Sequence, residues 1–147
     1  MGKRVEKTRN HFTKSEVGHL GWLIQLLRKG SQRWIPKAKA FKRASVGQIT
    51  NPKTGRLKEA WACEECGWVG FKKGRKDKEG VIADHVDPVI PVGKSRHICS
   101  RPDFDPEIHV CIGEVCDRMY VELDHWQILC HTCHKVKTDE ENKGRKG

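Results

Sequence analysis

The stretches Cys63-Glu-Glu-Cys66-Gly67 and Cys130-His-Thr-Cys133 decide the fold of this chain. Each contains a CxxC pair, which presents two thiolates from one tight turn. Two such pairs complete a tetrahedral shell of four sulfurs, and Gly67 lets the backbone fold back around them. We therefore predict a structural zinc ion bound by Cys63, Cys66, Cys130 and Cys133.

The wide separation of the two pairs gives this site a structural role. Sixty-three residues lie between Cys66 and Cys130, so the metal would hold two distant parts of the chain together. His131 or His134 in place of one cysteine makes a rival ligand set, and four thiols without a metal remain the simplest alternative. Seven cysteines are an odd number, which fits a disulfide framework poorly and favours metal ligation.

Length and composition limit what else can stabilise the chain. Its 147 residues suit one domain, or a small domain with an arm, and only 36% of them are hydrophobic, with a mean hydropathy of −0.71. No stretch approaches the ~18 apolar residues of a membrane span. The basic segment from Met1 to Asn10 is not followed by the apolar segment of a signal peptide. We expect a cytoplasmic protein with no membrane partner.

The charge is strongly basic and unevenly distributed. Lysine and arginine number 29 against 19 acidic residues, a net charge of +10. Residues 1–60 carry 15 basic and three acidic side chains, whereas residues 61–147 are close to neutral. A basic arm on a neutral module favours contact with a polyanion, most simply nucleic acid. The alternative is a solvated surface that keeps the chain soluble.

Periodicity divides the chain into an arm and a cysteine-bearing domain. We expect a basic tail at 1–12, a basic helical arm at 13–58, the main domain at 59–142 with an insert at about 91–121, and a basic tail at 143–147. Apolar spacing predicts helices from Ser15 to Lys29, from Lys37 to Val46 and from Cys130 to about Asn142.

The insert contains further residues of metal-ligating type. His97, Cys99, Cys111 and Cys116 have the right chemistry for a second metal site, but their spacing matches no established pattern. Packed or free thiols are the favoured interpretation of these cysteines.

Three linked motifs resemble the HNH endonuclease superfamily. They are Asp84-His85-Val-Asp-Pro, the segment from Asp124 to Cys130, and Cys133-His134-Lys-Val-Lys-Thr. Together with the CxxC pair of Cys63 and Cys66, they give a resemblance over roughly residues 61–139. The pattern is most like that of the small bacteriophage HNH endonucleases. The resemblance implies an α+β fold: a ββα-metal (His-Me) finger stapled by the four-cysteine zinc, preceded by the basic helical region.

The resemblance also implies roles for individual residues. Asp84 and His134 stand where the family binds its catalytic divalent metal, and His85 stands at the general base. A histidine with a reference pKa of ~6.5 suits that role at neutral pH. His125 occupies the position of the usual asparagine, which braces the loop carrying the first histidine. A metal such as Mg²⁺ or Mn²⁺ would neutralise charge on the phosphate.

Basic side chains near these motifs are candidates for phosphate contacts. We expect them at the start of the last helix, with Lys135 and Lys137, and along the second helix, with Lys37, Lys39, Lys42 and Arg43. A solvated helix face is the alternative in both places.

These expectations combine into one function and two competitors. We expect a phage-encoded, metal-dependent DNA endonuclease that nicks or cuts double-stranded DNA in the host cytoplasm, as a monomer or homodimer. One competitor is a non-catalytic, zinc-stabilised module that binds nucleic acid. The other is an accessory protein that interacts with phage packaging partners.

Overall fold

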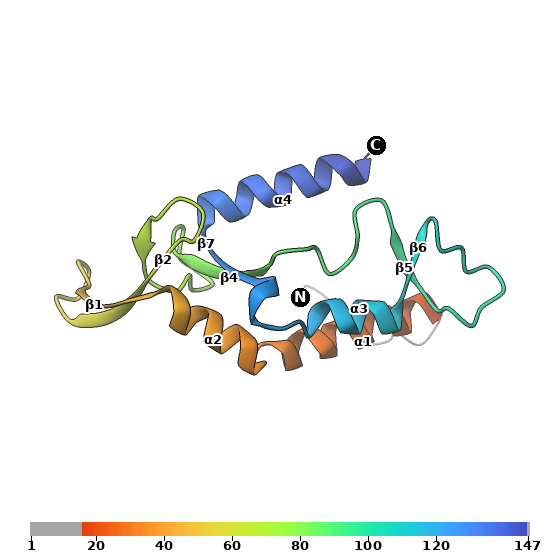
Figure 1. The fold of residues 1–147 in the computed structure, drawn as a ribbon, viewed down its shortest axis with the longest axis horizontal. Coiled ribbons are helices and arrows are strands. Elements are labelled where there is room, and N and C mark those ends of the chain that lie inside the picture. The colour runs from red at the N-terminus through yellow and green to blue at the C-terminus, as the bar shows by residue number, and fades with distance from the viewer. Residues whose placement is uncertain (1–15, 147) are drawn as a thin grey trace, which may run out of the picture.

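A computed structural model describes residues 16–146 of the chain. It has four helices, seven short strands and one 3₁₀ turn in this range, so the chain is of mixed α+β class (Figure 1). In chain order these are α1 (Glu16–Ser31), α2 (Ile35–Ala44), β1 (Ser45–Thr50), β2 (Leu57–Ala62), β3 (Val69–Gly70), β4 (Val81–His85), β5 (Ser95–His97), β6 (His109–Cys111), α3 (Ile112–Met119), η2 (Leu123–His125), β7 (Trp126–Cys130) and α4 (His131–Lys146). The predicted tail at 1–12 lies outside the described residues. No helix in the described part of the chain has the length and apolar content of a membrane span.

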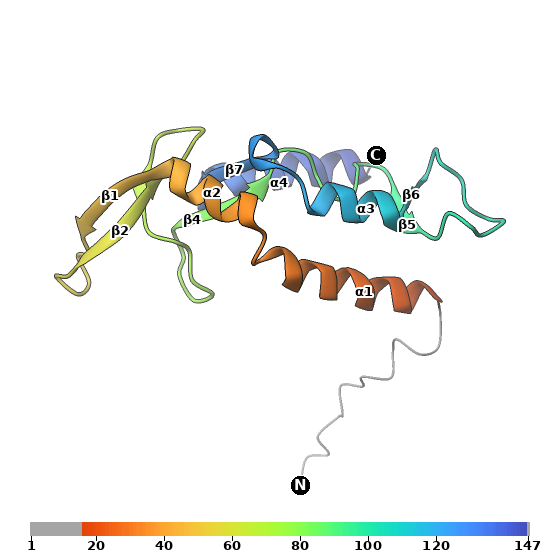
Figure 2. The same cartoon turned by 60° about the horizontal axis from the view of Figure 1, so that its bottom comes forward.

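An antiparallel strand pair forms the centre of the molecule. Strand β4 pairs with β7 from Val81 opposite Cys130 to His85 opposite Trp126, and α4 follows β7 without a break. Helices α2 and α4 lie on opposite sides of this pair (Figures 1 and 2). Residues 81–85 and 126–146 therefore form two antiparallel strands followed by a helix.

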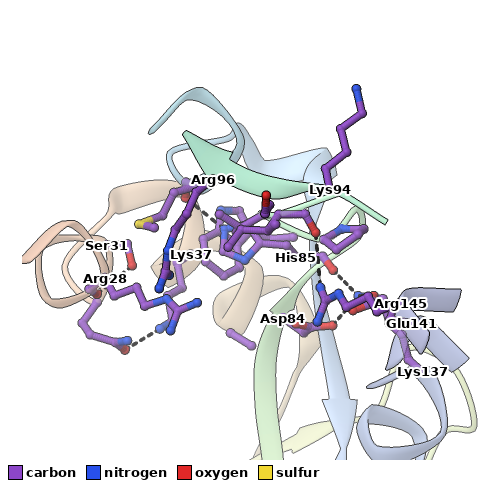
Figure 3. A pocket seen from close by; sticks show the side chains of 18 residues that line it. Arg28, Ser31, Lys37, Asp84, His85, Lys94, Arg96, Lys137, Glu141 and Arg145 are labelled. Carbon is purple, nitrogen blue, oxygen red and sulfur yellow. Dashed lines mark hydrogen bonds and ion pairs between the residues drawn. The ribbon is translucent and has the colours of Figure 1, made fainter. Parts of the chain in front are cut away.

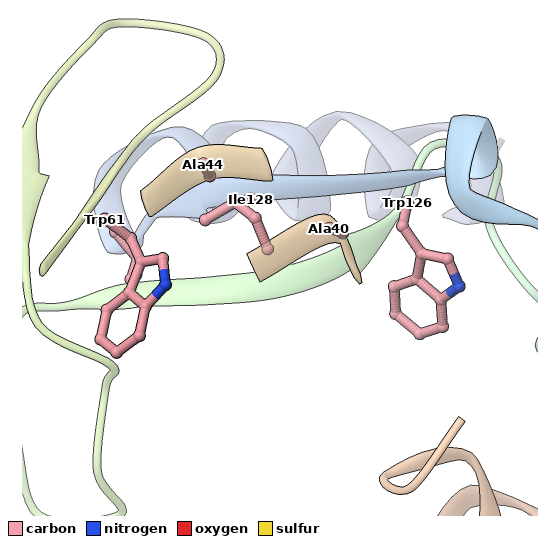
Figure 4. Packing of buried hydrophobic residues seen from close by; sticks show 6 residues of the cluster. Ala40, Ala44, Trp61, Trp126 and Ile128 are labelled. Atoms are coloured by element: carbon pink, nitrogen blue, oxygen red, sulfur yellow. The ribbon is translucent and has the colours of Figure 1, made fainter. Parts of the chain in front are cut away.

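Small residues allow α2 to pack closely against the strands. Pro36, Ala40 and Ala44 recur every four residues and make the buried face of α2. The alanines meet Ile128 of β7, which is fully buried, between the indole rings of Trp61 and Trp126 (Figure 4). Burying a side chain of this size contributes about 2–3 kcal/mol, so this cluster stabilises the strand pair.

The insert at 91–121 is ordered and makes a second core. It contains the parallel strands β5 and β6 and helix α3, and α3 packs against α1. Ile24, Val110, Val115 and Met119 are all buried there, at 1% exposure or less. The predicted arm and the predicted insert are therefore joined by a shared apolar contact.

Residues 45–50 form a strand, so the predicted helical arm at 13–58 is wrong in this part. The second helix ends at Ala44, before the predicted Val46, and β1 follows directly. Strand β1 pairs with β2 in an antiparallel hairpin with a register shift at Gly47, whose φ is +88°. Strand β2 crosses the predicted boundary between the arm and the main domain at residue 58. Pairing with β2 holds residues 45 and 46 in a strand, where the sequence predicted the end of a helix.

The predicted ends of the first and last helices are also wrong, and in both cases the helix continues through a glycine. Helix α1 continues through Gly30 and ends at Ser31. A Cβ atom on Gly30 would lie 2.5 Å from the hydroxyl of Tyr120. Helix α4 continues through the predicted tail at 143–147 as far as Lys146, and a Cβ on Gly144 would meet Val92 at 2.6 Å. Both glycines permit close packing instead of ending the helix.

Candidate zinc site and basic pocket

Four cysteine sulfurs gather where β2 and β7 end. The Sγ atoms of Cys63, Cys66, Cys130 and Cys133 all lie within 4.8 Å of one another. The Sγ atoms of Cys66 and Cys130 are 3.7 Å apart. A tetrahedral ion with Zn–S bonds of about 2.3 Å places its sulfurs about 3.8 Å apart. The four cysteines are therefore positioned to hold a metal ion, as predicted, and their arrangement is compatible with structural zinc.

Backbone groups prepare the sulfurs for this arrangement. Gly67, with a φ of +77°, donates its N–H to the Cys63 carbonyl at 2.9 Å and closes the first turn. Burial opposes ionisation of Cys63, but N–H groups of Cys66, Cys130 and Glu65 lower the pKa of this thiol to about 7. In the second turn, the N–H of Cys133 points to the Cys130 sulfur at 3.4 Å. Such donors stabilise thiolates, which are the metal-binding form.

Glu64 docks the first cysteine turn onto β7. Its N–H donates to the Ile128 carbonyl at 2.8 Å, and its carboxylate accepts the Ile128 N–H at 2.7 Å. Arg43 then grips the same carboxylate with two nitrogens, at 2.6 and 2.9 Å. It also donates to the carbonyls of Leu123 and Trp126. The guanidinium predicted to contact nucleic acid is therefore used within the protein.

Asp84 and His134 meet across the strand–helix junction. Asp84 lies near the end of β4 and His134 in the first turn of α4, and Oδ1 of Asp84 is 3.9 Å from Nε2 of His134. Ligand atoms that share one ion lie about 3–4 Å apart, because each is about 2.1 Å from the metal. This geometry fits the predicted pair, and the metal-holding group at the cysteine site contains the four cysteines without His134.

Lys137 already neutralises the Asp84 carboxylate. Its ammonium lies 2.6 Å from Oδ2 of Asp84 and 3.1 Å from Glu141. Burial opposes the charged form, but these two carboxylates outweigh it and raise the pKa of Lys137 above its usual value. Lys137 was predicted to bind phosphate, whereas its contacts in the structure are to carboxylates and to the His85 carbonyl.

His85 is held in one orientation by two neighbours. Its Nε2 lies 2.9 Å from the Met119 carbonyl oxygen, and its ring stacks on Trp126 with centroids 4.1 Å apart. Because a carbonyl only accepts, Nε2 carries the proton in this contact and Nδ1 keeps a lone pair. Burial lowers the pKa of His85, so the imidazole is neutral at pH 7.

The predicted bracing role of the His125 side chain is not supported. This imidazole is exposed, and its nearest ionic partner is the adjacent Asp124 carboxylate at 3.9 Å. The backbone does the bracing instead, since the His125 carbonyl accepts the N–H of Val86 at 2.9 Å. The amide of Gln127 adds a contact to the His85 carbonyl at 3.3 Å.

A cavity of about 620 Å³ opens beside His85 and Asp84 (Figure 3). Two carboxylates line it, those of Asp84 and Glu141. Six cationic side chains from four parts of the chain also line it: Arg28, Lys37, Lys94, Arg96, Lys137 and Arg145. Arg28, Lys94, Arg96 and Arg145 were not predicted from the sequence. The sequence indicated these four residues only through its general excess of basic side chains, because no local motif links them.

The other predicted basic residues lie in three different settings. Lys37 lines the cavity, and burial, followed by the charge of Lys72, lowers its pKa. Lys39 and Lys42 are exposed on α2. Lys135 pairs with Asp139 at 2.7 Å on the exposed face of α4. Only Lys37 and Lys137 of the predicted set therefore reach the cavity.

The cysteines of the insert depart from the prediction. Cys99 and Cys111 form a disulfide, and Cys116 on α3 is free. The favoured interpretation of packed or free thiols is wrong for this pair, because the fold brings the two residues to a Cα separation of 5.2 Å.

Comparison of the chain with family models, with curated proteins and with solved structures finds no match.

Proposed function

We propose that this chain is a metal-dependent HNH-type DNA endonuclease that hydrolyses phosphodiester bonds. In this proposal β4, β7 and α4 are the ββα-metal finger, and the four-cysteine zinc staples it to the preceding strands. One observation carries the proposal: Asp84 and a neutral His85 line one basic cavity, and His134 of α4 lies 3.9 Å from Asp84. A neutral base, a pair of metal ligands and cationic walls are the parts that phosphodiester hydrolysis needs.

Asp84 and His134 are the residues that would hold the catalytic cation. A carboxylate oxygen and an imidazole nitrogen suit Mg²⁺, Mn²⁺ and softer divalent ions. A cation held there supplies charge neutralisation for the phosphate and its leaving oxygen. Two protein ligands leave the remaining positions to water and substrate.

His85 would accept the proton of the attacking water. Its Nδ1 lone pair takes the proton, the water oxygen forms a bond to phosphorus, and the bond to the 3′ oxygen breaks. The departing 3′ oxygen takes a proton from solvent water, so the products are a 5′-phosphate and a 3′-hydroxyl. The Met119 carbonyl favours this role because it holds the other ring proton on Nε2.

The cationic wall of the cavity would bind the phosphates on either side of the scissile bond. Arg28, Lys37 and Arg96 lie on one side of His85, and Arg145 and Lys137 on the other (Figure 3). Such contacts release counterions, so affinity for DNA should fall steeply with added salt. We infer that the partner is double-stranded DNA, and that the protein is phage-encoded and acts in the host cytoplasm. Each monomer would nick one strand, and a homodimer would cut both strands.

A non-catalytic zinc module that binds nucleic acid is the second candidate. The ion pair between Lys137 and Asp84 favours it, because an ammonium occupies one oxygen of the proposed metal ligand. A packaging accessory protein would use the same basic surface. Both predict DNA binding without cleavage.

Plasmid cleavage by the wild type and by His85→Ala, Asp84→Asn and His134→Ala tests the proposal. Each protein is loaded with zinc, stripped of loosely bound metal and assayed with Mg²⁺, Mn²⁺, Ni²⁺ or no addition. We expect metal-dependent open-circle or linear DNA from the wild type, and a loss of about 10²–10⁴-fold in His85→Ala with DNA affinity and zinc content unchanged. Cleavage by His85→Ala at the wild-type rate, or binding without cleavage by the wild type under every metal, would contradict the proposal.

A further inference from the structure

Strands β5 and β6 each carry the same short motif. His97-Ile98-Cys99 begins at the end of β5, and His109-Val110-Cys111 makes up β6. The strands are parallel, with His97 opposite Cys111 and Ser95 opposite His109. Register partners share a face of a sheet, and so do residues two apart on one strand. His97, His109 and Cys111 therefore occupy one face of this strand pair, and Cys99, in the turn after β5, joins them through its bond to Cys111.

The alternation of β6 separates this face from the core. Val110 is fully buried against Ile24, Val115 and Met119. Its neighbours His109 and Cys111 consequently project to the opposite face. The apolar core stabilises only one side of a two-stranded sheet whose strands have three residues each. Such a small parallel pair needs a further constraint on its other side.

The two cysteines and the two histidines each form a close pair. The sulfurs of Cys99 and Cys111 are bonded to each other, and the imidazoles of His97 and His109 lie with ring centroids 4.5 Å apart. Phe104 packs against both imidazoles, with centroid distances of 6.2 and 5.8 Å. An aromatic ring beside the histidines shields this cluster from water on one side.

We propose that in the reduced protein His97, Cys99, His109 and Cys111 bind a second zinc ion. Two nitrogens and two sulfurs are a complete tetrahedral donor set for structural zinc. A phosphine reductant supplies the two electrons that cleave the Cys99–Cys111 bond and becomes a phosphine oxide, with water giving the oxygen and the two thiol protons. Zinc then displaces those two protons and binds both thiolates.

The ring hydrogen bonds show which nitrogen of each histidine carries no proton. The N–H of Ile98 donates to Nδ1 of His97 at 2.8 Å, and the N–H of Asp105 donates to Nδ1 of His109 at 3.0 Å. Both rings therefore carry their proton on Nε2 and keep a lone pair on Nδ1. When zinc binds, each Nδ1 loses its hydrogen bond from a backbone N–H and binds the metal instead. Nε2 of His97 lies 3.1 Å from the Asp103 carboxylate. A carboxylate on the outer nitrogen is a common support of metal-bound histidine.

Zinc content of the full-length protein tests the site. Wild type, Cys99→Ser/Cys111→Ser, His97→Asn/His109→Asn and the control Cys116→Ser are purified with a phosphine, incubated with Zn²⁺ and passed over a chelating resin. We expect about two zinc ions per chain in the wild type and in Cys116→Ser, and about one in each double variant. One zinc ion in the reduced wild type, or an undiminished count in the double variants, would overturn the proposal. The count needs no DNA, so it is independent of the nuclease proposal.

Cobalt binding by the wild type covers the case in which a double variant does not fold. Two Co²⁺ ions held by six thiolates should give about 1.5 times the sulfur-to-cobalt absorption of one ion held by four, as the chain is titrated from one to two equivalents. Saturation of this absorption at one equivalent would refute the second site.

Discussion

Replacement of Arg43 by methionine should destabilise the protein, and it should lower DNA affinity no more than the loss of one exposed charge elsewhere on α2 does. The guanidinium makes four hydrogen bonds, two to the Glu64 carboxylate and two to the carbonyls of Leu123 and Trp126. These bonds tie α2 to the first cysteine turn and to β7. Methionine keeps an apolar stem of similar length but has no donors.

The size of the effect follows from the exposure of these groups. The side chains of Arg43 and Glu64 are 39% and 29% exposed, so solvent limits their ion pair to about 1 kcal/mol at most. Each bond to a carbonyl contributes about 1 kcal/mol more. The free energy of unfolding should therefore fall by about 2–3 kcal/mol, and Tm by about 6–10 °C.

Thermal unfolding in excess zinc, followed by circular dichroism, measures this change. Lys42→Met is the matched control, because it removes the same charge from an exposed neighbouring position on α2 and should change stability by less than about 0.5 kcal/mol. DNA affinity of the two folded variants should be equal. A wild-type Tm for Arg43→Met together with a larger loss of DNA affinity than in Lys42→Met would refute this reasoning and restore Arg43 as a phosphate contact.

Three further perturbations test the metal site and the basic cavity. Cys66→Ser, or a strong chelator on the wild type, should lower Tm by more than Arg43→Met does, because structural zinc contributes directly to folding; an unchanged melting curve would exclude a structural metal. Cleavage should rise with pH and level off at a lower pH than an unshifted histidine would give, because burial lowers the pKa of His85 and the neutral ring is the base; stability should fall as the pH drops through the range in which histidine of the unfolded chain is protonated, since the unfolded chain then binds more protons. Lys137→Met should bind Mg²⁺ or Mn²⁺ about 3–10-fold more tightly in calorimetry without DNA, because the ammonium on Asp84 competes with the cation; weaker binding would show that the ammonium is not a competitor.

Short-range patterns predicted the parts of the fold that depend on neighbouring residues. Each CxxC pair places its two sulfurs within one turn, so Cys63, Cys66, Cys130 and Cys133 were identified from spacing alone. The helix after Cys130 also follows local periodicity. The missed strand β1 depends on pairing with β2, which a local pattern does not record.

The cationic side chains illustrate the limit of a sequence-based prediction. Three basic residues on predicted helices have different roles in the structure. Lys37 lines the cavity, Arg43 binds the first cysteine turn through Glu64, and Lys137 neutralises Asp84. Arg28 and Arg96, which no motif identified, reach the cavity from α1 and β5. The destination of a long side chain depends on which carboxylate or carbonyl the fold brings within its reach.

The sequence by itself determined the chemical inventory of this protein: four sulfurs in two turns, an aspartate beside a histidine, and an excess of positive charge. Only the tertiary structure decided how these groups combine. Packing of α3 against α1 brings the Met119 carbonyl to His85, and the pairing of β5 with β6 brings His109 beside His97. The inventory is local, because it depends on residue type and spacing. The combinations depend on contacts between residues far apart in the chain, which exist only once two hydrophobic cores have formed.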